Sequence, residues 1–66
     1  SYFSFMVPSD KEGLTTRIDK LIKQIGVKYQ TNGLADGIEY KLEFNSDDEV
    51  KGFKQALSDT VPNLYK

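Results

Sequence analysis

The chain has 66 residues, nine Lys or Arg, ten Asp or Glu and a formal net charge of −1, and it contains neither histidine nor cysteine. Disulfide bonds and the usual zinc ligand sets are therefore excluded, as are a histidine general base and a cysteine nucleophile. Residues 1–66 make a single small domain that buries only about 60% of its unfolded surface, and such domains are often stabilised by association.

The charge is uneven along the chain. Residues 1–30 carry five basic and three acidic side chains, whereas residues 31–66 carry four and seven. The protein is dipolar, and it lacks the strong positive excess that sequence-independent nucleic-acid binding normally needs.

No part of the sequence predicts contact with a membrane. The longest apolar run is far shorter than the roughly 18 residues that cross a bilayer, and no secretory leader precedes the first predicted strand. Absence of cysteine suits a reducing compartment, so we expect a cytoplasmic protein.

The first predicted element is an aromatic strand over residues 2–7, bounded by Pro8 and Ser9. Alternation divides its side chains between two faces. The core face carries Phe3, Phe5 and Val7, and the other face carries Tyr2, Ser4 and Met6.

A helix is predicted from Ser9, because Ser9 and Glu12 have the spacing of a capping box. Its apolar side chains form one stripe, and Gly26 stands where a left-handed helix end favours glycine. The stripe consists of Leu14, Ile18, Leu21, Ile22 and Ile25. Gly13 weakens the first turn and can delay the start of the helix by a few residues.

Two strands and a hairpin follow. Residues 27–31 alternate, and Asn32-Gly33 with Asp36-Gly37 predict a connection longer than the tightest two-residue turn. Residues 38–44 have the clearest period of two. Ile38, Tyr40, Leu42 and Phe44 face the core, and Glu39, Lys41 and Glu43 face the other way.

A second capping box, Ser46 with Glu49, predicts a second helix that Pro62 ends at about residue 60 or 61. Its inner side chains are Val50, Phe53, Ala56 and Leu57. Residues 63–66 form either a short final strand or a loose tail.

The order β-α-β-β-α, with or without a short final strand, predicts an α+β fold of the small ferredoxin-like, split βαβ type: two helices on one face of an antiparallel sheet. In that topology the first strand lies between the third and the fourth. Without a fourth strand its apolar edge is free to pair with another chain. The expected interaction residues are Tyr2, Ser4, Phe5 and Met6.

Residues 37–44, running into the second helix, resemble the RNA-recognition motif, which shares this fold. That resemblance implies bases stacked on aromatic side chains of the open sheet face. This chain departs from the pattern, because Glu39 and Glu43 would occupy that face and repel phosphate. No residue roles are transferred from the family.

Other candidate sites are weak. Asp47, Asp48 and Glu49 match no calcium loop and suit the start of a helix, so we expect neither a metal nor a cofactor. Thr15, Thr16 and Arg17 stand in a first helical turn without a phosphate-binding glycine loop. The remaining candidate is a basic face on or near the first helix: Arg17, Lys20, Lys23 and Lys28.

We therefore expect a non-enzymatic binding or regulatory protein that acts by protein–protein interaction, as a homodimer or with another protein. A viral, phage-type inhibitor of a host factor is one form of this. The main alternative is a nucleic-acid or nucleotide-binding module that uses the basic face. A third is a small-molecule sensor with its site in a dimer cleft.

Overall fold

The computed structural model describes residues 1–64 and shows a small α+β fold. Its elements in chain order are β1 (Tyr2–Pro8), the 3-10 helix η1 (Ser9–Leu14), α1 (Thr15–Ile25), β2 (Lys28–Leu34), β3 (Gly37–Glu43) and α2 (Asp47–Thr60). The predicted order of strands and helices is confirmed. No helix in this part of the chain is long and apolar enough to cross a membrane.

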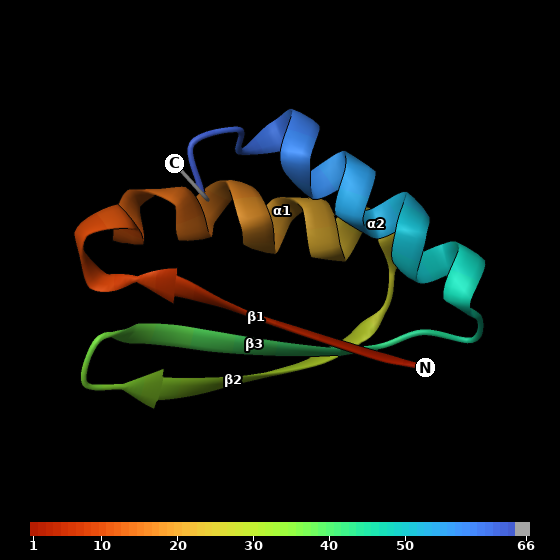
Figure 1. Cartoon of the computed structure of the whole chain (residues 1–66), viewed down its shortest axis with the longest axis horizontal. Coiled ribbons are helices and arrows are strands. Elements are labelled where there is room, and N and C mark those ends of the chain that lie inside the picture. Colours follow the sequence, from red (N-terminus) through yellow and green to blue (C-terminus); the bar gives the residue numbers. More distant parts are fainter. Residues whose placement is uncertain (65–66) are drawn as a thin grey trace.

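The three strands form one antiparallel sheet in the order β1-β3-β2. Both helices cover the same face of this sheet, and the opposite face is open, as Figure 1 shows. The central strand is β3, and β1 and β2 are the two edges within the part of the chain that the structure describes.

The core lies between the sheet and the two helices. Its buried side chains are Phe5, Val7, Ile18, Ile22, Tyr40, Leu42, Phe44, Phe53, Leu57, Val61 and Leu64. The predicted inner faces of β1, β3 and both helices are thus largely confirmed. Ile25 is the exception in the α1 stripe, because it lies at the exposed end of the helix.

The start of the first helix differs from the prediction. Pro8, not Ser9, precedes η1, and no side chain caps it. Ser9 donates its backbone N–H to the Asp36 carbonyl at 2.8 Å, so Glu12 cannot receive it as a capping box requires. The chain makes a kinked 3-10 segment, with non-helical angles at Lys11, and α1 begins only at Thr15.

The second helix begins as predicted. Ser46 Oγ accepts a hydrogen bond from the Glu49 backbone N–H at 3.3 Å. Glu49 Oε1 accepts from the backbone N–H of Asn45 at 2.9 Å, one residue before the expected donor. The helix ends at Thr60, and Gly26 ends α1 with a φ of 79°, both as expected.

The hairpin is tighter than predicted. Pairing continues to Leu34 opposite Gly37, so only Ala35 and Asp36 remain in the turn. Glycine is required at position 37 by the neighbouring strand and not by the turn, because a Cβ added there would lie 2.1 Å from the Val7 carbonyl oxygen. Close approach of β1 and β3 therefore requires glycine at this position.

The segment after α2 turns back on to the helical layer and does not join the sheet. Residues 62–64 form a turn, and the Leu64 side chain is buried. Lys11 Nζ donates to the carbonyl oxygens of Asn63 at 2.6 Å and Leu64 at 3.2 Å. The final strand is therefore absent at residues 63 and 64, and the rest of that prediction, residues 65 and 66, lies outside the described residues.

Candidate functional site

The hydrogen-bond pattern of β1 determines which of its backbone groups are free. Ser1 and Phe44 exchange two bonds, from the Ser1 nitrogen to the Phe44 oxygen at 2.9 Å and from the Phe44 nitrogen to the Ser1 oxygen at 2.7 Å. Such pairs alternate along an antiparallel ladder. The observed register then directs the backbone groups of Phe3, Phe5 and Val7 toward β3, and those of Tyr2, Ser4 and Met6 away from it.

The free edge of β1 carries little protection against pairing. No side chain in Tyr2–Pro8 is charged, and the outer side chains are exposed, with Tyr2 at 66% and Met6 at 39%. Natural edge strands usually carry a charge, a bulge or a proline. Here only Pro8 fills that role. By the same alternation Pro8 stands at an outward position, where it supplies no N–H and ends the run of free donors.

Comparison with protein-family models, curated proteins and solved structures gave no match to this chain.

Three of the four predicted edge residues, Tyr2, Ser4 and Met6, present both backbone and side chain at the β1 edge or on the open sheet face. Phe5 does not, because its side chain is only 7% exposed and stacks on Tyr40 with ring centroids 5.1 Å apart. The Phe5 side chain lies in the core beneath the edge, and its backbone groups form hydrogen bonds with β3.

Phe3 is the inner-face residue of β1 that stays partly exposed. Its ring lies 5.7 Å from Phe5 and 6.0 Å from Phe53, and Lys54 Nζ lies 5.2 Å from its centroid. The aromatic side chains of the core thus extend to the β1 edge, where the Lys54 cation of α2 lies over the Phe3 ring.

The β2 edge has a different character. All seven residues of β2 are exposed, and by alternation Tyr29, Thr31 and Gly33 direct their backbone groups outward. Lys28 begins the strand, and Gly33 offers no side chain to pack. The β2 edge also exposes apolar side chains, Tyr29 and Leu34, but unlike β1 it contains no buried residue and begins with a charge.

The open sheet face is polar, and Glu39, Lys41 and Glu43 lie on it as the alternation predicted, whereas Lys28 was not expected there. Lys28, Lys41, Glu39 and Glu43 are all exposed there. A hollow of about 410 Å³ is lined by Tyr2, Lys28, Tyr29, Gln30, Lys41 and Glu43. Lys41 Nζ lies 5.0 Å from the Tyr2 ring centroid, so Tyr2 already has a cation over its ring.

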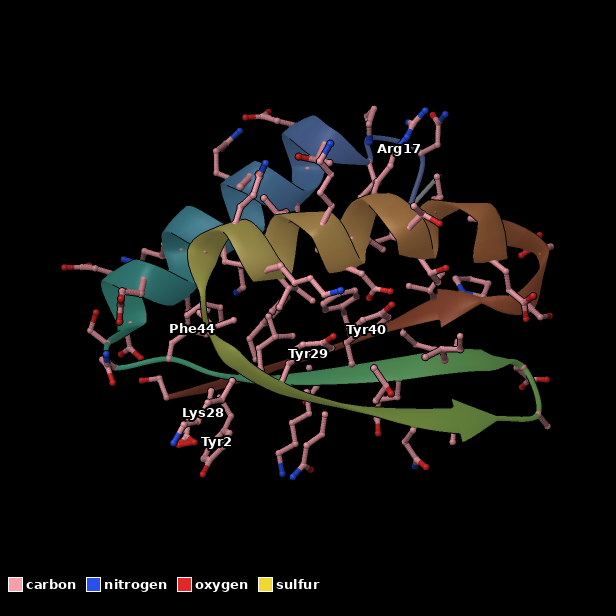
Figure 2. The ribbon with its side chains drawn as sticks, turned by 180° about the vertical axis from the view of Figure 1, so that it is seen from behind. Tyr2, Arg17, Lys28, Tyr29, Tyr40 and Phe44 are labelled. Carbon is pink, nitrogen blue, oxygen red and sulfur yellow. The ribbon has the colours of Figure 1, made fainter. Side chains whose placement is uncertain are left out.

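The predicted basic face does not form one patch. Lys20 and Lys23 line a shallow hollow on α1, which also contains Asp19. Arg17 extends from the helical layer, whereas Lys28 lies across the sheet beside Tyr2, as Figure 2 shows. The four cations are thus divided between the helical layer and the sheet.

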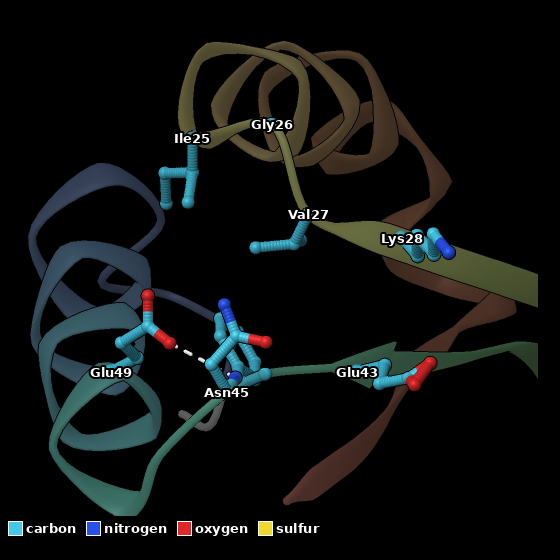
Figure 3. A pocket seen from close by; sticks show the side chains of 8 residues that line it. Ile25, Gly26, Val27, Lys28, Glu43, Asn45 and Glu49 are labelled. Atoms are coloured by element: carbon cyan, nitrogen blue, oxygen red, sulfur yellow. Dashed lines mark hydrogen bonds between the residues drawn. The ribbon is translucent and has the colours of Figure 1, made fainter.

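A further hollow of about 320 Å³ separates the end of α1 from the start of α2 (Figure 3). Ile25, Gly26 and Val27 line one side, and Asn45 and Glu49 line the other. The Glu49 carboxylate is held by the Asn45 N–H. Among residues 1–64 no group of His, Cys, Asp or Glu is arranged to hold a metal ion.

The buried phenol of Tyr40 is a feature that sequence reasoning missed. Its hydroxyl donates to Asp19 Oδ1 at 2.8 Å, and its ring also stacks on Tyr29 with centroids 6.3 Å apart. Burial, followed by the bond to the Asp19 carboxylate, raises the pKa of Tyr40 well above its usual range. Tyr40 is therefore a neutral structural donor.

Proposed function

We propose that this protein is a small non-enzymatic binding protein that works by protein–protein contact at the free edge of β1. We interpret the arrangement as a ferredoxin-like, split βαβ sheet that has no strand beyond β1 within residues 1–64. Strand order β1-β3-β2, with both helices on one face, agrees with that topology. A partner strand would occupy the missing position.

The observation that carries this proposal is the outward direction of the Tyr2, Ser4 and Met6 backbone groups. An extended segment placed beside an exposed edge gains main-chain hydrogen bonds, and the alternate side chains of the edge then determine which segment fits. The edge offers the apolar Tyr2 and Met6 side chains with no charged residue between them. We infer a partner segment that is extended and mainly apolar.

Strand addition also suggests how such a protein regulates its partner. A segment that pairs with β1 is no longer available for its own contacts, so the protein acts by occlusion and needs no catalytic group. A cytoplasmic inhibitor of a host factor, of the kind bacteriophages encode, is the regulatory role we propose.

The test uses the immobilised protein to capture partners from an extract of the cells in which it works, with its own tagged copy included. Met6→Pro removes one outward N–H without touching the β1–β3 ladder, and Thr31→Pro makes the equivalent change at the β2 edge. We expect capture to be lost with Met6→Pro and retained with Thr31→Pro. Equal capture by both variants, each shown to be folded by circular dichroism, would refute the proposal.

The nucleic-acid alternative has less support, because the structure separates Arg17 from Lys28 and because Glu39 and Glu43 offset the two lysines of the open sheet face. Arg17→Glu, Lys20→Glu and Lys23→Glu together replace the basic side chains of α1 with acidic ones. Loss of binding in this triple variant, with a steep dependence on salt and sensitivity to nuclease, would favour the alternative over the edge.

A further inference from the structure

We propose that the partner strand at the β1 edge is β1 of a second copy of this chain, paired antiparallel about a two-fold axis that passes through Ser4. This inference rests on the proposed function, and it adds the identity of the partner and the register of the contact. The result is a continuous six-stranded sheet with all four helices on one face.

Backbone groups that point outward alternate with groups that point toward β3, and this alternation limits the possible registers between two copies of β1. In an antiparallel pair, the outward groups of one edge must meet the outward groups of the other. With Ser4 opposite Ser4, Tyr2 lies opposite Met6 of the second copy, so all three outward residues of each β1 that carry an N–H find a partner.

The neighbouring registers are poorer. A shift that places Ser4 opposite Met6 also places Pro8 opposite Tyr2. Because proline has no N–H, this longer pairing gains no further hydrogen bond and leaves the Tyr2 carbonyl without a donor. A shift that places Tyr2 opposite Ser4 pairs only residues 2–4 of each β1, so the contact between Tyr2 and Met6 is lost. Pro8 therefore favours the register with Ser4 on the axis.

The side chains of the two copies are complementary in this register. On the open sheet face Tyr2 meets Met6, a contact between an aromatic ring and a thioether. On the inner face Phe3 meets Phe5 of the second copy at a non-hydrogen-bonded position, where side chains approach most closely. The partly exposed Phe3 ring then gains cover, and the aromatic cores of the two copies become continuous.

Charge does not oppose the contact within the strand. Like charges directly opposite each other destabilise a strand pair, and β1 contains none. A contact one strand wide is smaller than the roughly 1,200–2,000 Å² buried in stable interfaces, so we expect a dimer that dissociates on dilution.

Disulfide trapping tests the register directly, because the chain has no cysteine of its own. In an antiparallel pair, residues opposite each other at a hydrogen-bonded position have Cα atoms about 5.5 Å apart, within disulfide reach. Ser4→Cys would therefore link to itself across the axis. Two copies of Tyr2→Cys, or of Met6→Cys, would place their cysteines roughly 13 Å apart, which is too far.

Each single-cysteine variant is oxidised at matched concentration, and the crosslinked fraction is measured without reductant. We expect Ser4→Cys to crosslink at least tenfold faster than Tyr2→Cys, Met6→Cys or the β2-edge control Thr31→Cys. A mixture of Tyr2→Cys with Met6→Cys should crosslink as fast as Ser4→Cys. Equal rates for all variants, or a faster rate for Met6→Cys alone, would overturn this register.

The experiment also separates this inference from the proposed function. If light scattering shows a monomer at every concentration and Ser4→Cys does not crosslink, the second copy is excluded as partner. Capture of a different protein that still depends on Met6 would then preserve the edge function alone. If capture does not depend on Met6 either, both proposals are overturned.

Discussion

The Tyr40 hydroxyl donates a 2.8 Å hydrogen bond to Asp19 Oδ1 and so ties the central strand of the sheet to α1. Tyr40 is only 2% exposed, and its ring is stacked between Phe5 and Tyr29. Tyr40→Phe keeps the stack but removes the donor. Because the acceptor is a carboxylate, we expect a loss of about 1.5–3 kcal/mol in the free energy of unfolding, measured in urea.

Tyr29→Phe is the matched control for that experiment, because Tyr29 stacks on Tyr40 from the exposed β2 edge. We expect it to change stability by less than about 0.5 kcal/mol. An equal loss in both variants would show that ring packing, and not the bond to Asp19, holds β3 to α1.

Tyr40 also predicts how stability depends on pH. Its pKa is raised in the folded state, so on alkalinisation the unfolded chain loses this proton first. The contribution of Tyr40 is fully present below a pH of about 10, the usual tyrosine value, and is lost as the pH rises from there toward the folded pKa. In urea titrations at increasing pH, Tyr40→Phe should lose less stability above that pH than the unaltered protein.

Two glycines should respond in opposite ways to alanine. At Gly37 the new Cβ would lie 2.1 Å from the Val7 carbonyl oxygen, so β1 and β3 must separate or the variant must fail to fold. Gly52 lies inside α2 with open space around it, and alanine there should stabilise the protein by about 0.5–1 kcal/mol. Thermal melting measures both, and a stable Gly37→Ala variant would contradict the observed strand pairing.

The repeated S-x-x-E motif provides a third comparison. Ser46→Ala removes the oxygen that accepts from the Glu49 N–H and should cost about 1 kcal/mol. Ser9→Ala removes no cap, because η1 has no side-chain cap, and should stay within about 0.5 kcal/mol. Equal costs in chemical denaturation would show that Ser9 caps the helix in solution.

This difference between two identical motifs shows what local sequence could and could not predict. Periodicity identified the buried faces of β1, β3 and α2, because a period of two or 3.6 follows directly from strand and helix geometry. The failed cap at Ser9 depends on Asp36, which is far away in sequence and takes the Ser9 N–H. The bond between Tyr40 and Asp19 was missed for the same reason.

The sequence predicted part of the candidate site, as it predicted part of the fold. An apolar first strand with no visible partner already suggested an interaction edge at Tyr2, Ser4 and Met6. Which backbone groups are free could not be predicted, because that depends on the register with β3, which the Ser1–Phe44 pair reveals. The structure also buries the Phe5 side chain, in agreement with its predicted core face, and it separates Arg17 from Lys28.

Proline substitutions at adjacent positions of β1 test which of its backbone N–H groups point outward, and the edge proposal depends on this assignment. Phe5→Pro removes a donor to β3 and the ring that stacks on Tyr40, so we expect loss of at least about 3 kcal/mol or failure to fold. Met6→Pro removes an outward donor, and proline is tolerated at such edge positions, so we expect a folded protein. Thermal melting by circular dichroism compares the two. If Met6→Pro unfolds as readily as Phe5→Pro, the Met6 N–H lies within the sheet, and the outward edge is then formed by the other set of residues.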